Sequence, residues 1–266
     1  MTLEPATLAM LVAAALCGGF VDAIAGGGGL ITVPALLLAG LTPVEAVATN
    51  KLQGTFGVAS ATASYWRAGY VAFPSRALTI FCAAAGAIAG ALAVEAFDQR
   101  WLAAVIPFVL IAVAVYFALA AKLREGDGAR RIGAPAFAVG VTAPIGFYDG
   151  FFGPGAGSFY TLAFVALAGA GLLRAIGGTK VLNLTSNLAS LIVFVLSGHV
   201  LFAIGLAMAL GQVAGAWLGA RAAIAHGSRL IRPLIVIVSW AIALRLLIDP
   251  ANPAGECLRT AGARFL

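Results

Sequence analysis

The sequence predicts an all-α polytopic membrane protein made of two homologous repeats, each a glycine-broken (re-entrant) helix hairpin plus three spanning helices, with about eight spans in total. Three observations predict this class. Of the 266 residues, 62% are hydrophobic and 10% are charged, whereas about a quarter of the residues in an average soluble domain are charged. Apolar stretches long enough to cross a bilayer recur along the chain. The second half also repeats the pattern of the first.

The two halves share a pattern of small and polar residues. Gly19-Phe20-Val21-Asp22 returns 127 residues later as Gly146-Phe147-Tyr148-Asp149. Past a two-residue insertion the offset becomes 129, so that Lys51 matches Lys180. A duplication inside an apolar chain is typical of transporters whose site lies between two structural repeats.

The expected helices follow from the apolar stretches, taken in order. Stretches of spanning length lie at 6–25, 44–66, 74–95, 101–121, 175–197, 202–225 and 232–248, and shorter ones lie at 30–40, 134–149 and 157–172. A helix over 44–66 would be about 34 Å long, enough to cross the hydrocarbon core. The short stretches predict re-entrant or discontinuous helices, which a membrane tolerates only where protein or a watery cavity satisfies the backbone.

These stretches divide the chain into a first transmembrane repeat over 1–121, a linker over 122–133, a second repeat over 134–248 and a tail over 249–266. The linker carries a dense basic cluster and is therefore predicted to be cytoplasmic. Alternation from that loop puts the turn at Arg229 inside and its repeat partner, the turn at Arg100, outside, so we expect inverted repeats. The N-terminal stretch has Glu4 and no Lys or Arg before it, which predicts a span rather than a cleavable signal.

The net charge of +6 does not indicate nucleic-acid binding, because the basic residues fall mainly between the spanning segments. Three cysteines predict no disulfide framework. His199 and His226 lie near segment ends and lack ligand spacing, so no metal or other cofactor is expected. No nucleophile, base and orienting acid occur in a workable arrangement, so we expect no enzyme activity.

Two glycine runs interrupt the short stretches at equivalent places, Gly26-Gly27-Gly28-Gly29 and Gly153-Pro154-Gly155-Ala156-Gly157. Each leaves free N–H groups at the start of the following helix, and such helix N-termini attract anions. We expect the glycines of both runs to bind substrate, with close helix packing as the alternative. Packing is the prediction for the later runs, Gly86-xxx-Gly90 and Gly211-xxx-Gly215-xxx-Gly219, and we expect Gly86 to tolerate alanine.

The repeat-equivalent Lys51 and Lys180 are two of the chain's three lysines. Lys51 lies about 10 Å from the start of its predicted helix, and an ammonium at such depth is costly unless it is paired or hydrated. We expect both lysines to bind substrate, with snorkelling to the nearer interface as the alternative. The polar residues expected to bind substrate beside them are Thr49, Asn50, Gln53, Thr179, Asn183 and Asn187.

Asp22 and Asp149 stand at matching positions, each a few residues before its glycine run. An acid at such a place can relay a coupling proton, pair with a lysine or cap a broken helix. All three roles remain alternatives, and both residues are candidates for proton coupling. Nothing in the sequence marks a sodium site.

These motifs resemble those of the TauE/SafE family of sulfite exporters and related organosulfur anion permeases. The resemblance rests on GGFVDAIAGGGGLITVP (residues 18–34) followed by AVATNKL (46–52), and on GFFGPGAG (150–157) followed by GTKVLN (178–183). It covers about residues 8–248. It implies a bacterial inner-membrane permease, usually drawn with about eight spans, for sulfite or organosulfur anions.

The residues and the resemblance together predict a secondary transporter that moves a small sulfur oxyanion, such as sulfite or a sulfonate, by alternating access. The anion would lie between the two hairpins. Its expected partners are the small oxyanion substrate, the lipid bilayer and, for coupling, protons. An anion channel is the first alternative, and a membrane enzyme acting on a lipid-linked substrate is the second.

Overall fold

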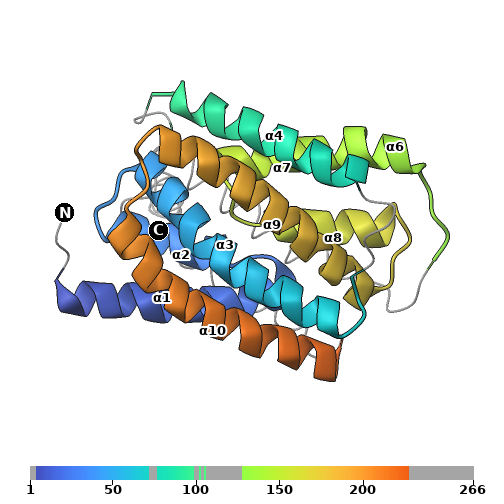
Figure 1. Ribbon diagram of the computed structural model, residues 1–266, viewed down its shortest axis with the longest axis horizontal. Coiled ribbons are helices and arrows are strands. Elements are labelled where there is room, and N and C mark those ends of the chain that lie inside the picture. The colour runs from blue at the N-terminus through green and yellow to red at the C-terminus, as the bar shows by residue number, and fades with distance from the viewer. Residues whose placement is uncertain (1–3, 72–76, 99–101, 103–104, 106–127, 228–266) are drawn as a thin grey trace, which may run out of the picture.

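The computed structural model describes residues 4–71, 77–98, 102, 105 and 128–227, and within these ranges the regular elements are helices and no strand occurs. Figure 1 shows how the helices are arranged. The predicted span at 232–248, nearly all of the span at 101–121, part of the linker and the tail at 249–266 lie outside the described residues.

The first half forms the helices α1 (Pro5–Ala25), α2 (Gly29–Leu38), α3 (Pro43–Arg67) and α4 (Ala77–Glu95). The chain leaves α1 at Gly26, whose φ of 80° suits a residue without a Cβ. α3 begins with a capping box, in which Thr42 and Glu45 each accept a hydrogen bond from the other's backbone N–H. Helices are confirmed in the predicted stretches 6–25, 30–40, 44–66 and 74–95, although α2 ends at Leu38 and residues 74–76 lie outside the described residues.

The second half begins with a helix that widens in its middle. Its parts are α6 (Ala134–Phe137), the π-helical turn η1 (Ala138–Thr142) and α7 (Ala143–Phe151). Pro144 has no N–H to donate to the carbonyl four residues before it, and beside it Ala143 donates to Ala138, five residues back. The helices that follow are α8 (Ala156–Ala166), α9 (Leu172–Leu196) and α10 (Phe202–His226).

The first helix of each half packs against a long helix of the other half. α1 packs along α10, and α7, the counterpart of α1, packs along α4 (Figure 1). A Cβ on Gly215 would lie 1.9 Å from the Leu16 carbonyl oxygen, and one on its repeat partner Gly86 would lie 2.2 Å from that of Ala143. The packing prediction for these glycines is therefore confirmed. The expectation that Gly86 tolerates alanine is wrong, because the added methyl group would force α4 away from α7.

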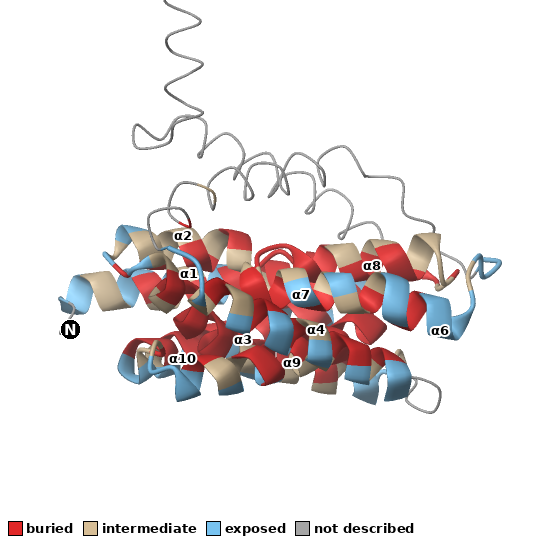
Figure 2. Cartoon of the chain, turned by 90° about the horizontal axis from the view of Figure 1, so that it is seen from above, coloured by how far each residue is buried: buried red, intermediate tan, exposed pale blue. Residues whose placement is uncertain are grey.

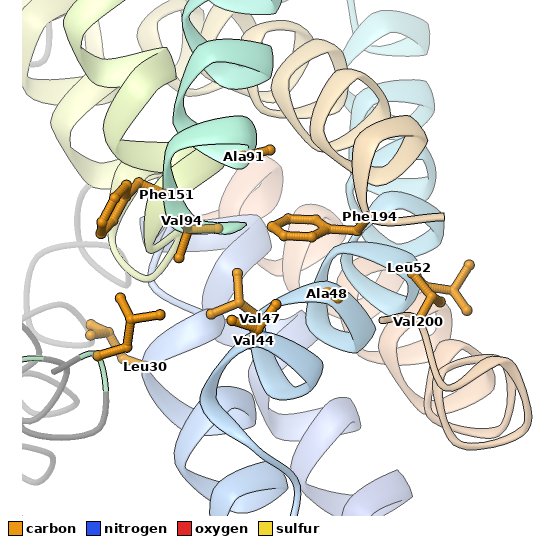
Figure 3. Packing of buried hydrophobic residues seen from close by; sticks show 11 residues of the cluster. Leu30, Val44, Val47, Ala48, Leu52, Ala91, Val94, Phe151, Phe194 and Val200 are labelled. Carbon is orange, nitrogen blue, oxygen red and sulfur yellow. The ribbon is translucent and has the colours of Figure 1, made fainter. Parts of the chain in front are cut away.

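α3 and α9 occupy the centre, and the start of each helix lies at the end of the other. An apolar cluster at one end joins Val44 on α3 to Phe194 on α9 and Val94 on α4 (Figure 3). At the opposite end, Tyr65 on α3 packs with Ile176 on α9. Seen from above, α2 and α8 lie on one side and α9 and α10 on the other, with buried residues between them (Figure 2). The middle of the molecule is thus closed by apolar side chains at both ends.

Four of the described helices, α1, α4, α9 and α10, are long and apolar enough to cross a membrane. α3 has 25 residues, as α9 does, but a run of buried polar residues follows its first turn. This composition suits a helix whose polar face is turned toward other helices, because a polar group facing lipid would have no partner.

Candidate substrate site

The two broken hairpins meet at their glycine runs in the interior. A Cβ on Gly157 would lie 2.7 Å from the Cα of Gly26, and one on Gly29 would lie 3.0 Å from the Cα of Pro154. The Ser158 hydroxyl donates a hydrogen bond to the carbonyl oxygen of Ala25, which ties α8 to the end of α1. The two runs therefore form one junction to which both halves contribute.

Two buried ion pairs cross between the halves at this junction. The Nζ of Lys51, on α3, lies 2.6 Å from Oδ1 of Asp149, on α7. The Nζ of Lys180, on α9, lies 2.9 Å from Oδ2 of Asp22, on α1. Each pair joins the lysine of one half to the aspartate of the other. The snorkelling alternative is wrong, because each lysine side chain is only 1% exposed and ends at a carboxylate.

The Lys51–Asp149 pair is supported by two further side chains of α9. Lys51 also donates a hydrogen bond of 3.0 Å to Oδ1 of Asn187. The Ser186 hydroxyl donates to Oδ2 of Asp149. Both carboxylate oxygens are therefore engaged, as are two of the three ammonium hydrogens of Lys51.

The Lys180–Asp22 pair has weaker support. Lys180 donates to Oδ2 of Asp22 and to the backbone carbonyl oxygen of the same residue. Among the described residues, Oδ1 of Asp22 accepts only a long hydrogen bond of 3.4 Å from the Gly28 N–H. The Asp22 side chain is also more open, at 13% exposed against 5% for Asp149.

The difference between the pairs follows from the sequences of α3 and α9. At the 129-residue offset, Ser186 matches Gly57 and Asn187 matches Val58. The first half therefore has no hydroxyl or amide at the positions that match Ser186 and Asn187, the two residues that support the Lys51–Asp149 pair. Gln212, on α10, occupies the space beside Gly57, since a Cβ there would lie 2.3 Å from its Cγ.

A narrow cavity lies at the junction. Its volume is about 30 Å³ over the positions that the centre of a water molecule can occupy, and one water needs about 10–15 Å³ on that measure. Both halves line it, through Asp22, Gly26, Gly29, Asn50, Lys51, Gln53, Gly54, Val58, Asp149, Gly153, Gly155, Ala156, Gly157, Asn183, Asn187 and Gln212. The space therefore suits a ligand of a few atoms.

Most residues predicted for the site thus lie together, but Lys180, Thr49, Thr179, Gly27 and Gly28 are not part of the cavity wall. The Thr49 hydroxyl oxygen instead accepts the N–H of Leu201. Thr179 and Thr161 share a hydrogen bond of 3.0 Å. Some amides of the glycine runs are used within the chain, since Ala156 donates to the Gly153 carbonyl oxygen.

Two threonines that sequence reasoning missed make repeated hydrogen bonds. The Thr32 hydroxyl donates to Oδ1 of Asn50 at 2.6 Å, and the Thr161 hydroxyl donates to that of Thr179. The two contacts match at the 129-residue offset. Each fixes the short helix after a glycine run to the long helix that carries the lysine.

Gln212 lines the cavity and was also missed. Its Oε1 is buried and has no hydrogen-bond partner among the described residues, and the same holds for Oε1 of Gln53 and Oδ1 of Asn183. Buried polar atoms without partners are rare, so in a cavity they indicate a ligand or ordered water. The signal was present in the sequence, because Gln212 is the single amide side chain in the apolar stretch 202–225.

The charges at the junction balance one another. Pairing with lysine is the structural role of both Asp22 and Asp149, out of the three roles considered above. Two ammonium groups and two carboxylates have no net charge, so an anion that enters adds an uncompensated charge in a medium of low dielectric constant. Elsewhere in the described ranges, no group of three or more His, Cys, Asp or Glu residues is placed to hold a metal ion.

Comparison with known proteins assigns the chain to a family. The family model described as "Sulfite exporter TauE/SafE" matches residues 11–246, which include both hairpins and both ion pairs. The protein belongs to the TauE/SafE family. The family match confirms the resemblance drawn from the glycine and lysine motifs.

Similar proteins from bacteria are named as membrane transporters. The chain is 49% identical to "Probable membrane transporter protein ORF9" of Sinorhizobium sp. over 92% of this chain and 94% of that relative. It is 45% identical to YfcA of Escherichia coli K12 over 92% and 91%, and 24% identical to YunE of Bacillus subtilis over 86% and 92%. No solved structure matches the chain. Together with its apolar helices, these relatives make this TauE/SafE protein a membrane protein of a transporter family.

Proposed function

We propose that this protein is a secondary transporter that moves a small sulfur oxyanion, with sulfite as the first candidate, across the bacterial inner membrane by alternating access. The observation that carries the proposal is the small buried cavity between the two halves, with the Lys51 ammonium in its wall. A charged donor in a site of low dielectric constant binds an oxyanion strongly. The family description supplies the chemical class of the cargo.

The size of the cavity supports a small cargo. Its 30 Å³ corresponds to two or three ordered waters. Sulfite, with one sulfur and three oxygen atoms, is close to that size. A longer organosulfonate would need the two glycine runs to move apart, and Gly26 and Gly157 are in contact.

Amide side chains supply hydrogen bonds without adding net charge. Gln53, Asn183 and Gln212 each have an amide oxygen at the cavity that finds no partner in the described part of the chain. A half turn about the last side-chain bond exchanges the C=O and NH₂ ends of an amide, so Asn183 and Gln212 can offer N–H groups to an oxyanion. Gln53 keeps its orientation, because its NH₂ group donates to Oδ1 of Asn50 at 2.7 Å. The same groups can accept hydrogen bonds from water when the site holds no anion.

The charge balance supports proton coupling. Because the two lysines are already neutralised by Asp22 and Asp149, an entering anion is best compensated by a proton on one carboxylate. Protonation also weakens the hold of that carboxylate on its lysine. The proton and the anion would then cross the membrane together.

The arrangement of the halves supports alternating access between inverted repeats. α1 with α10 and α7 with α4 form equivalent packed pairs, and α3 and α9 run in opposite directions past the site. In transporters of this kind one half rocks against the other around a fixed site. The apolar clusters containing Val44 and Tyr65 would serve as the two gates. With 101–121 and 232–248 as further spans, the chain would cross the membrane about eight times.

Transport in proteoliposomes tests the proposal. We expect purified protein to take up radiolabelled sulfite saturably, faster when unlabelled sulfite is inside, and to accumulate it when the outside is more acidic than the inside. Protein-free liposomes and the Lys51→Met variant are the controls. Unitary currents without counterflow would identify a channel instead, and sulfite flux no greater than in protein-free liposomes would overturn the proposed cargo.

A further inference from the structure

The two repeat-equivalent lysines face different surroundings. Lys51 lines the cavity, and its Nζ lies against Gly153, where a Cβ would be 3.3 Å away. Its hydrogen bonds go to two different residues, Asp149 and Asn187. An ammonium has three N–H groups, so one remains for a group in the cavity. Lys180 is not part of the cavity wall, and it donates twice to Asp22.

The two aspartates differ in the opposite sense. Both line the cavity, but both oxygens of Asp149 have close donors, from Lys51 and Ser186. Within the described ranges, Oδ1 of Asp22 has only the distant Gly28 N–H. A hydrogen on any of the other three carboxylate oxygens would face a close donor hydrogen. Oδ1 of Asp22 is therefore the carboxylate oxygen with room for a proton.

Lys180 holds the end of α1 as well as the carboxylate. The Asp22 carbonyl oxygen that accepts from Lys180 also accepts the Gly26 N–H that closes the helix. The C-terminal end of a helix carries partial negative charge, which an ammonium stabilises. Lys180 thus fixes both the backbone and the side chain of Asp22, and it is not itself part of the cavity wall.

Few other titratable groups surround Asp22. The helices packed against α1 are α2, α3, α8, α9 and α10, and near Asp22 they present Lys180 and Tyr65, whose hydroxyl donates to the Ala23 carbonyl oxygen. α3 also presents Lys51 at the cavity, paired with Asp149. Within the described ranges, the other titratable residues of these helices lie toward the helix ends, except for Tyr160, whose hydroxyl donates to the Thr142 carbonyl oxygen. Those toward the ends are Glu45, Arg67, Arg174, Arg221 and His226.

Resting on the proposed function, we propose that the two halves have different tasks at one site. Lys51 contacts the oxyanion through its third N–H, and Asp22 carries the proton that balances the charge of the anion. Lys180 is a positioning residue that holds Asp22 and does not touch the substrate. With Asp22 protonated at Oδ1, Lys51, Lys180 and Asp149 sum to one positive charge, which one monoanion cancels. The coupling is therefore one proton for each monoanion.

The matched charge-neutral double variants Lys180→Met/Asp22→Asn and Lys51→Met/Asp149→Asn, each of which removes one whole ion pair, test which carboxylate takes the proton. The measurement is the sulfite Kd of the purified protein by titration calorimetry between pH 5.5 and 8.5. The titration of sulfite itself is common to all variants and cancels when each Kd is divided by the wild-type Kd at the same pH. We expect the ratio for Lys180→Met/Asp22→Asn to fall by about tenfold for each unit of rising pH over part of the range, because this variant has lost the carboxylate that takes the proton. The ratio for Lys51→Met/Asp149→Asn, which keeps Asp22, should stay constant with pH.

Lysine variants test the second half of the proposal. Lys51→Met should raise the sulfite Kd by more than about tenfold, the loss expected for one charged hydrogen bond. Lys180→Met should bind sulfite more tightly than Lys51→Met does at acidic pH. The double variant Lys51→Met/Asp149→Asn should show the same rise in sulfite Kd. That result would separate the lost contact with the anion from the effect of leaving Asp149 unpaired.

The outcomes separate this inference from the proposed function. A pH-dependent ratio for Lys51→Met/Asp149→Asn, with a constant one for Lys180→Met/Asp22→Asn, would overturn the assignment of the proton. Equal loss of binding in Lys51→Met and Lys180→Met, both monodisperse on size exclusion, would overturn the division between the lysines. Absence of sulfite binding and sulfite flux by the wild-type protein would overturn the proposed function itself.

Discussion

The Nζ of Lys51 lies 2.6 Å from Oδ1 of Asp149, which is 98 residues further along the chain. The contact joins the central helix of the first half to the broken helix of the second, and Lys180 with Asp22 makes the reciprocal connection. In the proposed alternating-access cycle, two halves that rock against each other would either carry these pairs with them or open them. The pairs therefore connect the stability of the protein to the proposed cycle.

The Lys51–Asp149 pair gives a first prediction about stability. Lys51→Met alone leaves a buried carboxylate without its cation and should lower the free energy of unfolding by about 3–5 kcal/mol. The double variant Lys51→Met/Asp149→Asn should recover most of that loss, because no unpaired charge remains. Thermal unfolding in detergent measures both. Arg67→Met, at the exposed end of the same helix, is the control. Simple addition of the two single effects would show that the residues do not act as a pair.

The glycine junction gives a second prediction, with a matched control in the same motif. A Cβ on Gly157 would lie 2.5 Å from Nδ2 of Asn183 and 2.7 Å from the Cα of Gly26. Gly157→Ala should therefore separate the hairpins at a cost of about 1–3 kcal/mol and reduce sulfite flux by about tenfold or more. A Cβ on Gly27 would meet nothing closer than Leu30 Cδ1 at 3.5 Å, so Gly27→Ala should transport within about threefold of wild type. Equal effects in the two variants would contradict the close contact.

The sequence was sufficient for much of this site because the duplication reports each polar position twice. The helices, the junction of the glycine runs and the burial of Lys51 and Lys180 all followed from apolar length and repeat matching. The sequence did not predict which aspartate pairs with which lysine, because pairing across the halves depends on how α1 and α7 cross the long helices α3 and α9. Gln212 had no repeat signal, because Ala83 stands at the matching position. For Gly86, the sequence spacing indicated packing. Only the structure shows that alanine is excluded, because its Cβ would lie 2.2 Å from the Ala143 carbonyl oxygen.

Gln212 gives a third prediction. Its Oε1 is buried at the cavity and accepts no hydrogen bond from the described residues. Gln212→Leu therefore breaks no such bond, and the unfolding midpoint should stay close to that of wild type. The sulfite Kd should rise by about tenfold, since the anion loses one amide donor. Met208→Leu, which is one turn away on α10 and also buried, is the control. A loss of stability without a change in Kd would make Gln212 a packing residue only.

The orientation of the repeats gives the last prediction, and Ala68 and Ser197 are the positions that test it. They match at the 129-residue offset, each caps the C-terminal end of a central helix, and both are exposed. In inverted repeats, equivalent positions lie on opposite sides of the membrane. The distribution of basic residues predicts that the turn after α3 lies in the cytoplasm and the turn after α9 outside.

In a background with Cys17, Cys82 and Cys257 replaced by alanine, Ser197→Cys should react with a membrane-impermeant maleimide in spheroplasts, whereas Ala68→Cys should react only after lysis. Labelling of both from one side would mean that the repeats are parallel. In that case α3 and α9 could not pass the site in opposite directions. The packing of α1 on α10 and of α7 on α4 would then need another explanation.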